Sequence, residues 1–158
     1  MKENPEQQVL RSKLLPGILS AEGFLGSDPR SPAEIIQADR LAAEKLGFSH
    51  YELAARMRQL TEAGKSGLGR QVIVDGFLAV TVTDAMGAIP CPFSDNYQAS
   101  KQITQVENLR TGLTASWSDL NIHMIEKHGF YEGQGSAFRI EPATIASLIE
   151  AAGQTGKV

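Results

Sequence analysis

The chain has 158 residues, of which 42% are hydrophobic and 21% are charged, which is typical of one globular domain. Its formal net charge of −3 argues against a dominant role in binding polyanions, because neutralising phosphates requires concentrated lysine and arginine. The single cysteine excludes an internal disulfide framework, and no stretch approaches the ~20 apolar residues that span a bilayer. We therefore expect a cytoplasmic protein.

The N-terminal region divides into a polar segment and an apolar segment. Residues 1–13 are polar and lack the apolar core of a signal peptide, so we expect a flexible tail before a single domain at 14–158. The stretch from Leu14 to Leu25 is apolar but interrupted by glycine. Either the core or a partner subunit must cover it, and 14–25 is therefore the expected surface of a homodimer.

Two capping boxes predict a helical hairpin over residues 31–64. The first box, Ser31-Pro-Ala-Glu34, has proline at the first helical position, where its missing N–H is harmless. This helix is expected to end at Gly47, because glycine readily adopts the left-handed conformation of a C-terminal cap. The second box, Ser49-His-Tyr-Glu52, begins a helix with apolar residues at helical spacing that ends at Gly64.

The middle of the chain predicts a small antiparallel sheet over residues 72–117. Residues 72–82 are expected to form two strands joined by Asp75-Gly76, which is a strong hairpin signal. A second hairpin is expected over 103–117, because two short strand patterns flank a turn-forming segment there.

The C-terminal part predicts two further helices. Ser118 can cap a helix over 118–128, and Pro142 begins a final helix over 142–152. Arg139 and Ile140 are predicted as a short strand between them. The expected fold class is therefore α+β, with an N-terminal helical hairpin, a small antiparallel sheet of two hairpins and two C-terminal helices.

Thiol and imidazole side chains in the C-terminal half suggest a metal site. Cys91 lies between two prolines, and His123 and His128 lie on the helix predicted over 118–128. Zinc prefers thiolate and imidazole ligands, and zinc fingers tolerate this histidine spacing. An ideal helix would direct the two imidazoles about 140° apart, so a shared ion requires a tightened last turn.

The fourth ligand and the surroundings of this site are less closely specified. We assign the fourth ligand to Asp119, with Asp95, Glu132 or water as alternatives, since there is no second cysteine. A glycine-rich loop follows the histidine helix and is expected to form one wall of a pocket. The residues expected to line this pocket are Glu126, Phe130 and Tyr131.

The same residues also allow two other interpretations. In the first, they are structural: His123 is solvated, His128 favours the negative end of the helix dipole, and Cys91 is buried and inert. In the second, Cys91 is a nucleophile that one of the two histidines activates as a base.

The helix pair offers a different function. Residues 43–53, Ala-Glu-Lys-Leu-Gly-Phe-Ser-His-Tyr-Glu-Leu, resemble the helix-turn-helix family of DNA-binding proteins, with a small residue, a glycine four positions on and an aliphatic residue six beyond. The resemblance implies a recognition helix over 49–60. The residues it implies for DNA contact are Ser49, His50, Tyr51, Arg56 and Arg58. Two glutamates on the same helix, Glu52 and Glu62, oppose this interpretation.

The leading hypothesis is a small cytoplasmic binding or regulatory protein whose C-terminal half is organised around Cys91, His123 and His128, with zinc as the metal. The alternatives are a helix-turn-helix regulator and a small cysteine- or metal-dependent enzyme that uses the same residues.

Overall fold

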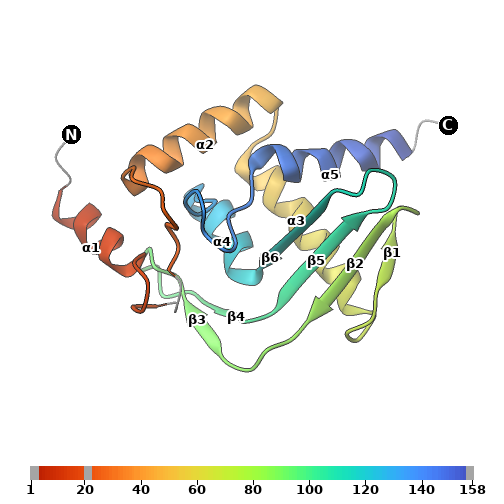
Figure 1. Ribbon diagram of the computed structural model, residues 1–158, viewed down its shortest axis with the longest axis horizontal. Helices are drawn as coiled ribbons and strands as arrows, with labels where there is room; N and C mark the ends of the chain where they lie inside the picture. Colours follow the sequence, from red (N-terminus) through yellow and green to blue (C-terminus); the bar gives the residue numbers. More distant parts are fainter. Residues whose placement is uncertain (1–3, 20–22, 156–158) are drawn as a thin grey trace.

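A four-stranded antiparallel sheet lies at the centre of the computed structural model, which describes residues 4–19 and 23–155. The strand order is β1-β2-β5-β6, and a separate two-stranded sheet pairs β3 with β4 (Figure 1). The strands are β1 (Val72–Val74), β2 (Leu78–Thr83), β3 (Ala88–Pro90), β4 (Gln98–Ser100), β5 (Ile103–Asn108) and β6 (Thr114–Ser118). The predicted α+β class is confirmed.

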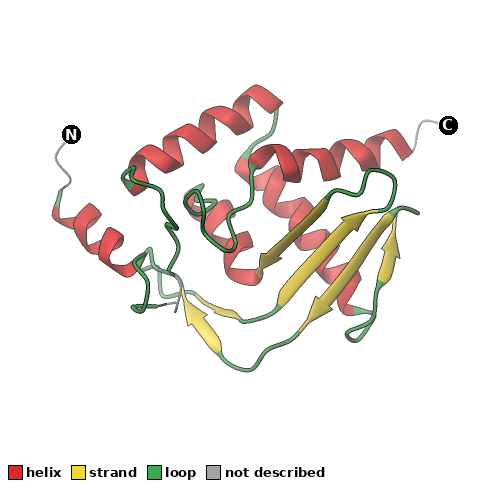
Figure 2. Ribbon diagram, in the orientation of Figure 1, coloured by secondary structure: helices red, strands yellow, loops and turns green. Residues whose placement is uncertain are grey.

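Most of the helices gather on one side of the larger sheet, whereas the N-terminal helix lies away from it, as Figure 2 shows. They are α1 (Pro5–Lys13), α2 (Pro32–Leu46), α3 (His50–Lys65), α4 (Asp119–His128) and α5 (Pro142–Thr155). α3 packs against β2, α4 and α5, whereas α2 packs against α5 and α1. Among the described residues, no helix is both long and apolar enough to cross a membrane.

The predicted helical hairpin is present with both of its capping boxes. Ser31 accepts a hydrogen bond from the backbone N–H of Glu34, and Ser49 accepts one from that of Glu52. Gly47 ends α2 with φ 84°, in the left-handed region that favours glycine. Both helices pack against α5, but α3 alone also packs on β2 and α4.

Both predicted hairpins of the sheet are also present. Val74 pairs with Leu78, so the first turn contains Phe77 in addition to Asp75 and Gly76. The φ values of Asp75 and Gly76 are 55° and 81°, as expected of residues that tolerate left-handed backbone. The second hairpin pairs β5 with β6, in agreement with the expected position.

Three segments differ from the sequence-based expectations. Residues 5–13, expected as part of a flexible tail, form α1, since Asn4 and Gln7 make a capping box and proline stands at its first turn. α5 continues past residue 152. Arg139 and Ile140 form no strand, because the Arg139 N–H donates to the Ser136 carbonyl in a local turn.

The buried apolar residues form two clusters. One lies between the larger sheet and helices α3 and α5, and includes Met57, Val80 and Trp117. The other contains Cys91, Phe130 and three residues of the 14–25 stretch, namely Leu14, Phe24 and Leu25. This stretch therefore contributes to the protein's own core. Leu15 and Ile18 stay exposed, so the predicted homodimer contact through 14–25 depends on these two side chains. Residues 20–22 of the stretch lie outside the described residues.

Candidate metal centre

Four side chains with metal-binding atoms converge at one end of α4. The ligand atoms of Cys91, Asp95, His123 and His128 all lie within 4.8 Å of one another. Cys91 directly follows β3, Asp95 lies in the loop between β3 and β4, and both histidines lie on α4. We call these four residues the Cys91 centre. It contains the predicted cysteine and both predicted histidines.

One carboxylate oxygen links the two imidazoles. His123 Nε2 and His128 Nε2 donate to Asp95 Oδ2 at 2.6 and 2.7 Å. His128 is the last residue of α4, directly before the left-handed cap at Gly129. Its position at the helix end lets its ring turn towards that of His123, with 5.6 Å between the ring centroids. The angular separation expected of an ideal helix is therefore overcome.

Aromatic rings fix the orientation of both imidazoles. Tyr97 stacks on His123 with 3.8 Å between centroids and 6° between planes. Phe93 stacks on His128 at 4.1 Å and 8°. Stacked rings restrict side-chain rotation, so the two Nε2 atoms are held towards Asp95 before any ion binds.

The loop between β3 and β4 holds the thiol close to the carboxylate. The Cys91 N–H donates to the Tyr97 carbonyl at 2.8 Å, and Cys91 is 5% exposed. Burial raises the pKa of the Cys91 thiol to about 12. Burial also acts to raise the pKa of Asp95, but the hydrogen bonds from His128 and His123 outweigh it and hold that pKa well below its ordinary value.

Asp119, the predicted fourth ligand, lies outside the Cys91 centre. It is the first residue of α4 and accepts hydrogen bonds from Ser100 Oγ at 2.7 Å and from Gln102 Nε2. Asp95, an alternative in the sequence-based assignment, occupies the fourth position instead. A loop carboxylate four residues after the cysteine can reach the histidines, whereas the first turn of α4 is directed towards β4 and the segment after it.

The three residues expected to line a pocket lie in different surroundings. Phe130 is buried and packs edge-on against Phe93 at 5.5 Å. Tyr131 is buried and its hydroxyl is hydrogen-bonded to His50 Nδ1 at 2.8 Å. Glu126 lines a pocket of about 620 Å³ that also includes His128 and residues of the α2–α3 turn. Of the three, Glu126 therefore lines this pocket beside the Cys91 centre.

The residues that the helix-turn-helix resemblance implies for DNA contact have partners inside the protein. The Arg56 side chain is 6% exposed and forms an ion pair with Asp75 at 2.8 Å. Arg58 pairs with Glu126 at 2.7 Å. Ser49 caps α3 and His50 binds the Tyr131 hydroxyl, whereas Tyr51 is 62% exposed.

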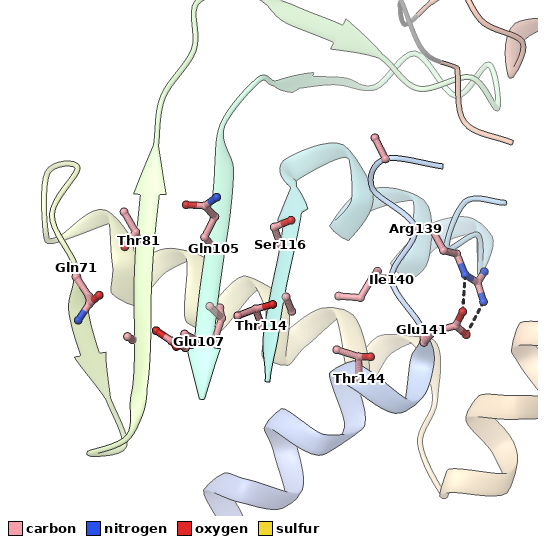
Figure 3. A pocket seen from close by; sticks show the side chains of 14 residues that line it. Gln71, Thr81, Gln105, Glu107, Thr114, Ser116, Arg139, Ile140, Glu141 and Thr144 are labelled. Carbon is pink, nitrogen blue, oxygen red and sulfur yellow. Dashed lines mark hydrogen bonds and ion pairs between the residues drawn. The ribbon is translucent and has the colours of Figure 1, made fainter. Parts of the chain in front are cut away.

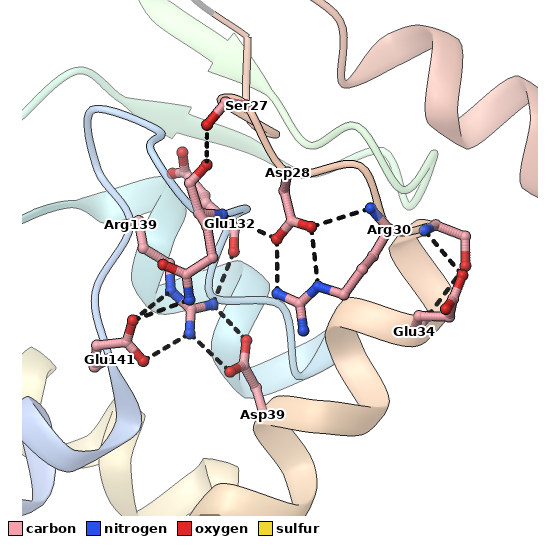
Figure 4. Close-up of polar contacts among 10 residues, drawn as sticks. Ser27, Asp28, Arg30, Glu34, Asp39, Glu132, Arg139 and Glu141 are labelled. Carbon is pink, nitrogen blue, oxygen red and sulfur yellow. Dashed lines mark hydrogen bonds and ion pairs between the residues drawn. The ribbon is translucent and has the colours of Figure 1, made fainter.

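A buried polar network joins α2 to the segment between α4 and α5 (Figure 4). Arg139 donates to Asp39, to Glu141 and to the carbonyl of Glu132. The Glu132 carboxylate accepts from Asn121 Nδ2 at 2.7 Å and Ser136 Oγ at 2.6 Å. Burial raises the pKa of Glu132 to about 7. The sequence contains no local signal for this network, because Asp39 and Arg139 are distant in the chain.

Comparisons of the chain with protein-family models, with curated proteins and with solved structures gave no significant match. Function is therefore inferred from the side chains that the fold brings together.

Proposed function

We propose that this protein binds a zinc ion through Cys91, Asp95, His123 and His128, as a small non-catalytic binding or regulatory protein. The observation that supports this most strongly is the convergence of four ligand atoms within 4.8 Å of one another. One thiolate, two imidazoles and one carboxylate form a donor set that zinc accepts in tetrahedral sites.

The spacing of the donor atoms is close to what a tetrahedral ion requires. With zinc bonds of about 2.0–2.3 Å, neighbouring donors lie roughly 3.3–3.6 Å apart. The two contacts from the imidazoles to Asp95, at 2.6 and 2.7 Å, would have to lengthen. The Asp95 side chain is 26% exposed, so it can rotate outwards more easily than the buried thiol can move.

A structural role suits the position of the proposed ion. It would join the loop between β3 and β4 to α4, and both belong to the smaller apolar cluster around Cys91 and Phe130. A closed set of four protein ligands is typical of structural zinc, whereas catalytic zinc keeps one position for water or substrate. Zinc binding would therefore add directly to folding free energy.

A thiol nucleophile is less well supported. Cys91 is buried, and burial raises the pKa of its thiol to about 12, whereas reactive cysteines are partly exposed and have lowered pKa values. A cytoplasmic location, which we also propose, would keep this single thiol reduced and available as a ligand.

Metal analysis of the untagged protein tests the proposal. We expect about one zinc per chain, and a chelator should lower the melting temperature, because metal binding energy becomes folding energy. His128→Ala should abolish zinc binding. His50→Ala is the matched control, since His50 lies outside the Cys91 centre and should leave the stoichiometry unchanged. Protein that takes up no zinc, and whose melting temperature does not respond to chelator, would contradict the proposal.

A further inference from the structure

The outer edge of β6 is open. β6 is the last strand of the four-stranded sheet, and among the described residues it pairs only with β5. The opposite edge of the sheet is the three-residue strand β1, so β6 is the longer of the two edges. An unpaired edge presents backbone N–H and C=O groups that another chain can use.

The register shows which backbone groups are free. Asn108 N donates to the Leu113 carbonyl, and Asp119 N donates to the Gln102 carbonyl. In an antiparallel ladder the hydrogen-bonded pairs alternate along the strand. The residues of β6 that bond to β5 are therefore the odd-numbered ones, and the N–H and C=O groups of Thr114 and Ser116 point away from the sheet.

A pocket lies beside this edge. Its volume is about 560 Å³, and it extends from the uncovered face of the sheet to the segment between α4 and α5. Figure 3 shows Arg139, Ile140 and Glu141 on the side of β6 that faces away from β5. Side chains from the sheet give it a polar face of hydroxyl and amide groups; they include Thr81, Gln105, Thr114 and Ser116.

The pocket has two chemically different walls. The side chains on the open face of the sheet are polar apart from Ala79, whereas Ala137 and Ile140, between α4 and α5, supply apolar atoms beside the paired charges of that segment. A strand presents alternate side chains to opposite faces. A segment with alternating polar and apolar residues would therefore match both walls.

The charged residues that line the pocket indicate which charge a binding partner should carry. They are Glu107, Arg139 and Glu141, and Arg139 already pairs with Glu141 and with Asp39. Glu107 is exposed, and within the described part of the chain it has no ion pair. Glu107 belongs to β5, the strand next to β6, where it pairs with Thr114, so the unpaired charge in the pocket lining beside the edge is negative.

We propose that the outer edge of β6 binds an extended peptide segment of another protein as a fifth strand, with a lysine or arginine near Glu107. Main-chain hydrogen bonds to Thr114 and Ser116 supply affinity, and the alternating side chains supply selectivity, as in other cases of strand addition. A second copy of this chain fits less well, because its β6 (Thr114–Ser118) has no lysine or arginine to place near Glu107. This inference is independent of the zinc proposal.

Binding of a synthetic probe peptide tests the proposal. The probe is acetyl-Thr-Val-Lys-Val-Thr-amide, titrated into the ¹⁵N-labelled full chain while the amide signals of Thr114 and Ser116 are followed by NMR. We expect saturable shifts at these two amides with a Kd below about 1 mM. A probe with glutamate in place of lysine should bind at least about tenfold more weakly, and an N-methylated probe should not bind.

Two variants locate the site. Ser116→Pro removes an N–H that points away from β5, so the ladder is kept, as at other edge prolines, and the lysine probe should bind at least about tenfold more weakly. Glu107→Gln should abolish the preference for lysine over glutamate, and it changes only an exposed side chain. Absence of shifts at millimolar probe, or equal binding of the N-methylated probe, would overturn the proposal. The proposal would also be overturned if the Ser116 amide signal shifted with protein concentration in the absence of peptide. In that case a second copy of this chain would occupy the edge of β6.

Discussion

Asp39 and Arg139 are 100 residues apart in the chain and form a two-pronged ion pair, with Nη1–Oδ2 and Nη2–Oδ1 distances of 2.5 and 2.8 Å. Each side chain is only 7% exposed. Asp39 lies on α2, and Arg139 lies just before α5. The pair therefore fixes α2, which packs less on the sheet than α3 does, against the C-terminal part of the protein.

Breaking this pair should be costly. Asp39→Asn removes the buried one of the two carboxylate partners of Arg139 and leaves the half-exposed Glu141, so the free energy of unfolding should fall by about 3 kcal/mol, the lower end of the cost of breaking a buried ion pair. Glu126→Gln is the matched control, because its partner Arg58 is 48% exposed and such pairs contribute less than about 1 kcal/mol. Urea unfolding monitored by circular dichroism measures both. Equal losses in the two variants would show that burial of the Asp39–Arg139 pair has no effect on stability.

The identity of the fourth ligand can be tested with two carboxylates. Asp95→Ala should weaken zinc binding by at least about tenfold, because the substitution removes one of the four proposed coordinate bonds. Asp119→Ala should leave the zinc affinity unchanged, since Asp119 is hydrogen-bonded to Ser100 and Gln102 instead. Competition with a fluorescent chelator measures both affinities. The reverse order of effects would restore Asp119 as the ligand.

Glu132 should make stability depend on pH. Burial raises the pKa of its carboxyl from 4.5 to about 7, so between these values the folded protein holds a proton that the unfolded chain has released. Stability contributed by this group is therefore present at low pH and is lost as pH rises through about 7, by roughly 3 kcal/mol.

Glu132→Gln removes this titration, and the hydrogen bonds from Asn121 and Ser136 to the side chain can be kept in part. Relative to the wild type, the variant should therefore gain free energy of unfolding as the pH rises from 5 to 8. Urea unfolding across this range measures it. Parallel curves for the two proteins would mean that Glu132 titrates normally in the folded state.

We expect no specific DNA binding. Arg56 is buried and paired with Asp75, and Arg58 is paired with Glu126, so α3 offers few free cations for phosphates. Because phosphate contacts dominate affinity for duplex DNA, a mobility-shift assay with random duplex at low salt should show no complex. A complex that weakens steeply as salt rises, and that Arg58→Ala disrupts, would contradict this expectation.

Local chemistry made much of the fold predictable from the sequence. The capping boxes at Ser31 and Ser49, the glycine that ends α2 and the Asp75-Gly76 turn each act within a few residues. Their effects on backbone conformation therefore follow from short-range hydrogen bonds and steric limits. The capping box at Asn4 belongs to the same class, and α1 could have been predicted from it.

The candidate site was predictable only in part. The donor chemistry of Cys91, His123 and His128 follows from residue type and spacing, but the choice of Asp95 over Asp119 depends on where the loop between β3 and β4 places its side chains. Likewise, the Asp39–Arg139 pair and the open edge of β6 exist only once distant segments have packed. Such contacts depend on the three-dimensional arrangement of the whole chain, whereas the sequence alone determines helix ends, turns and the supply of ligand atoms.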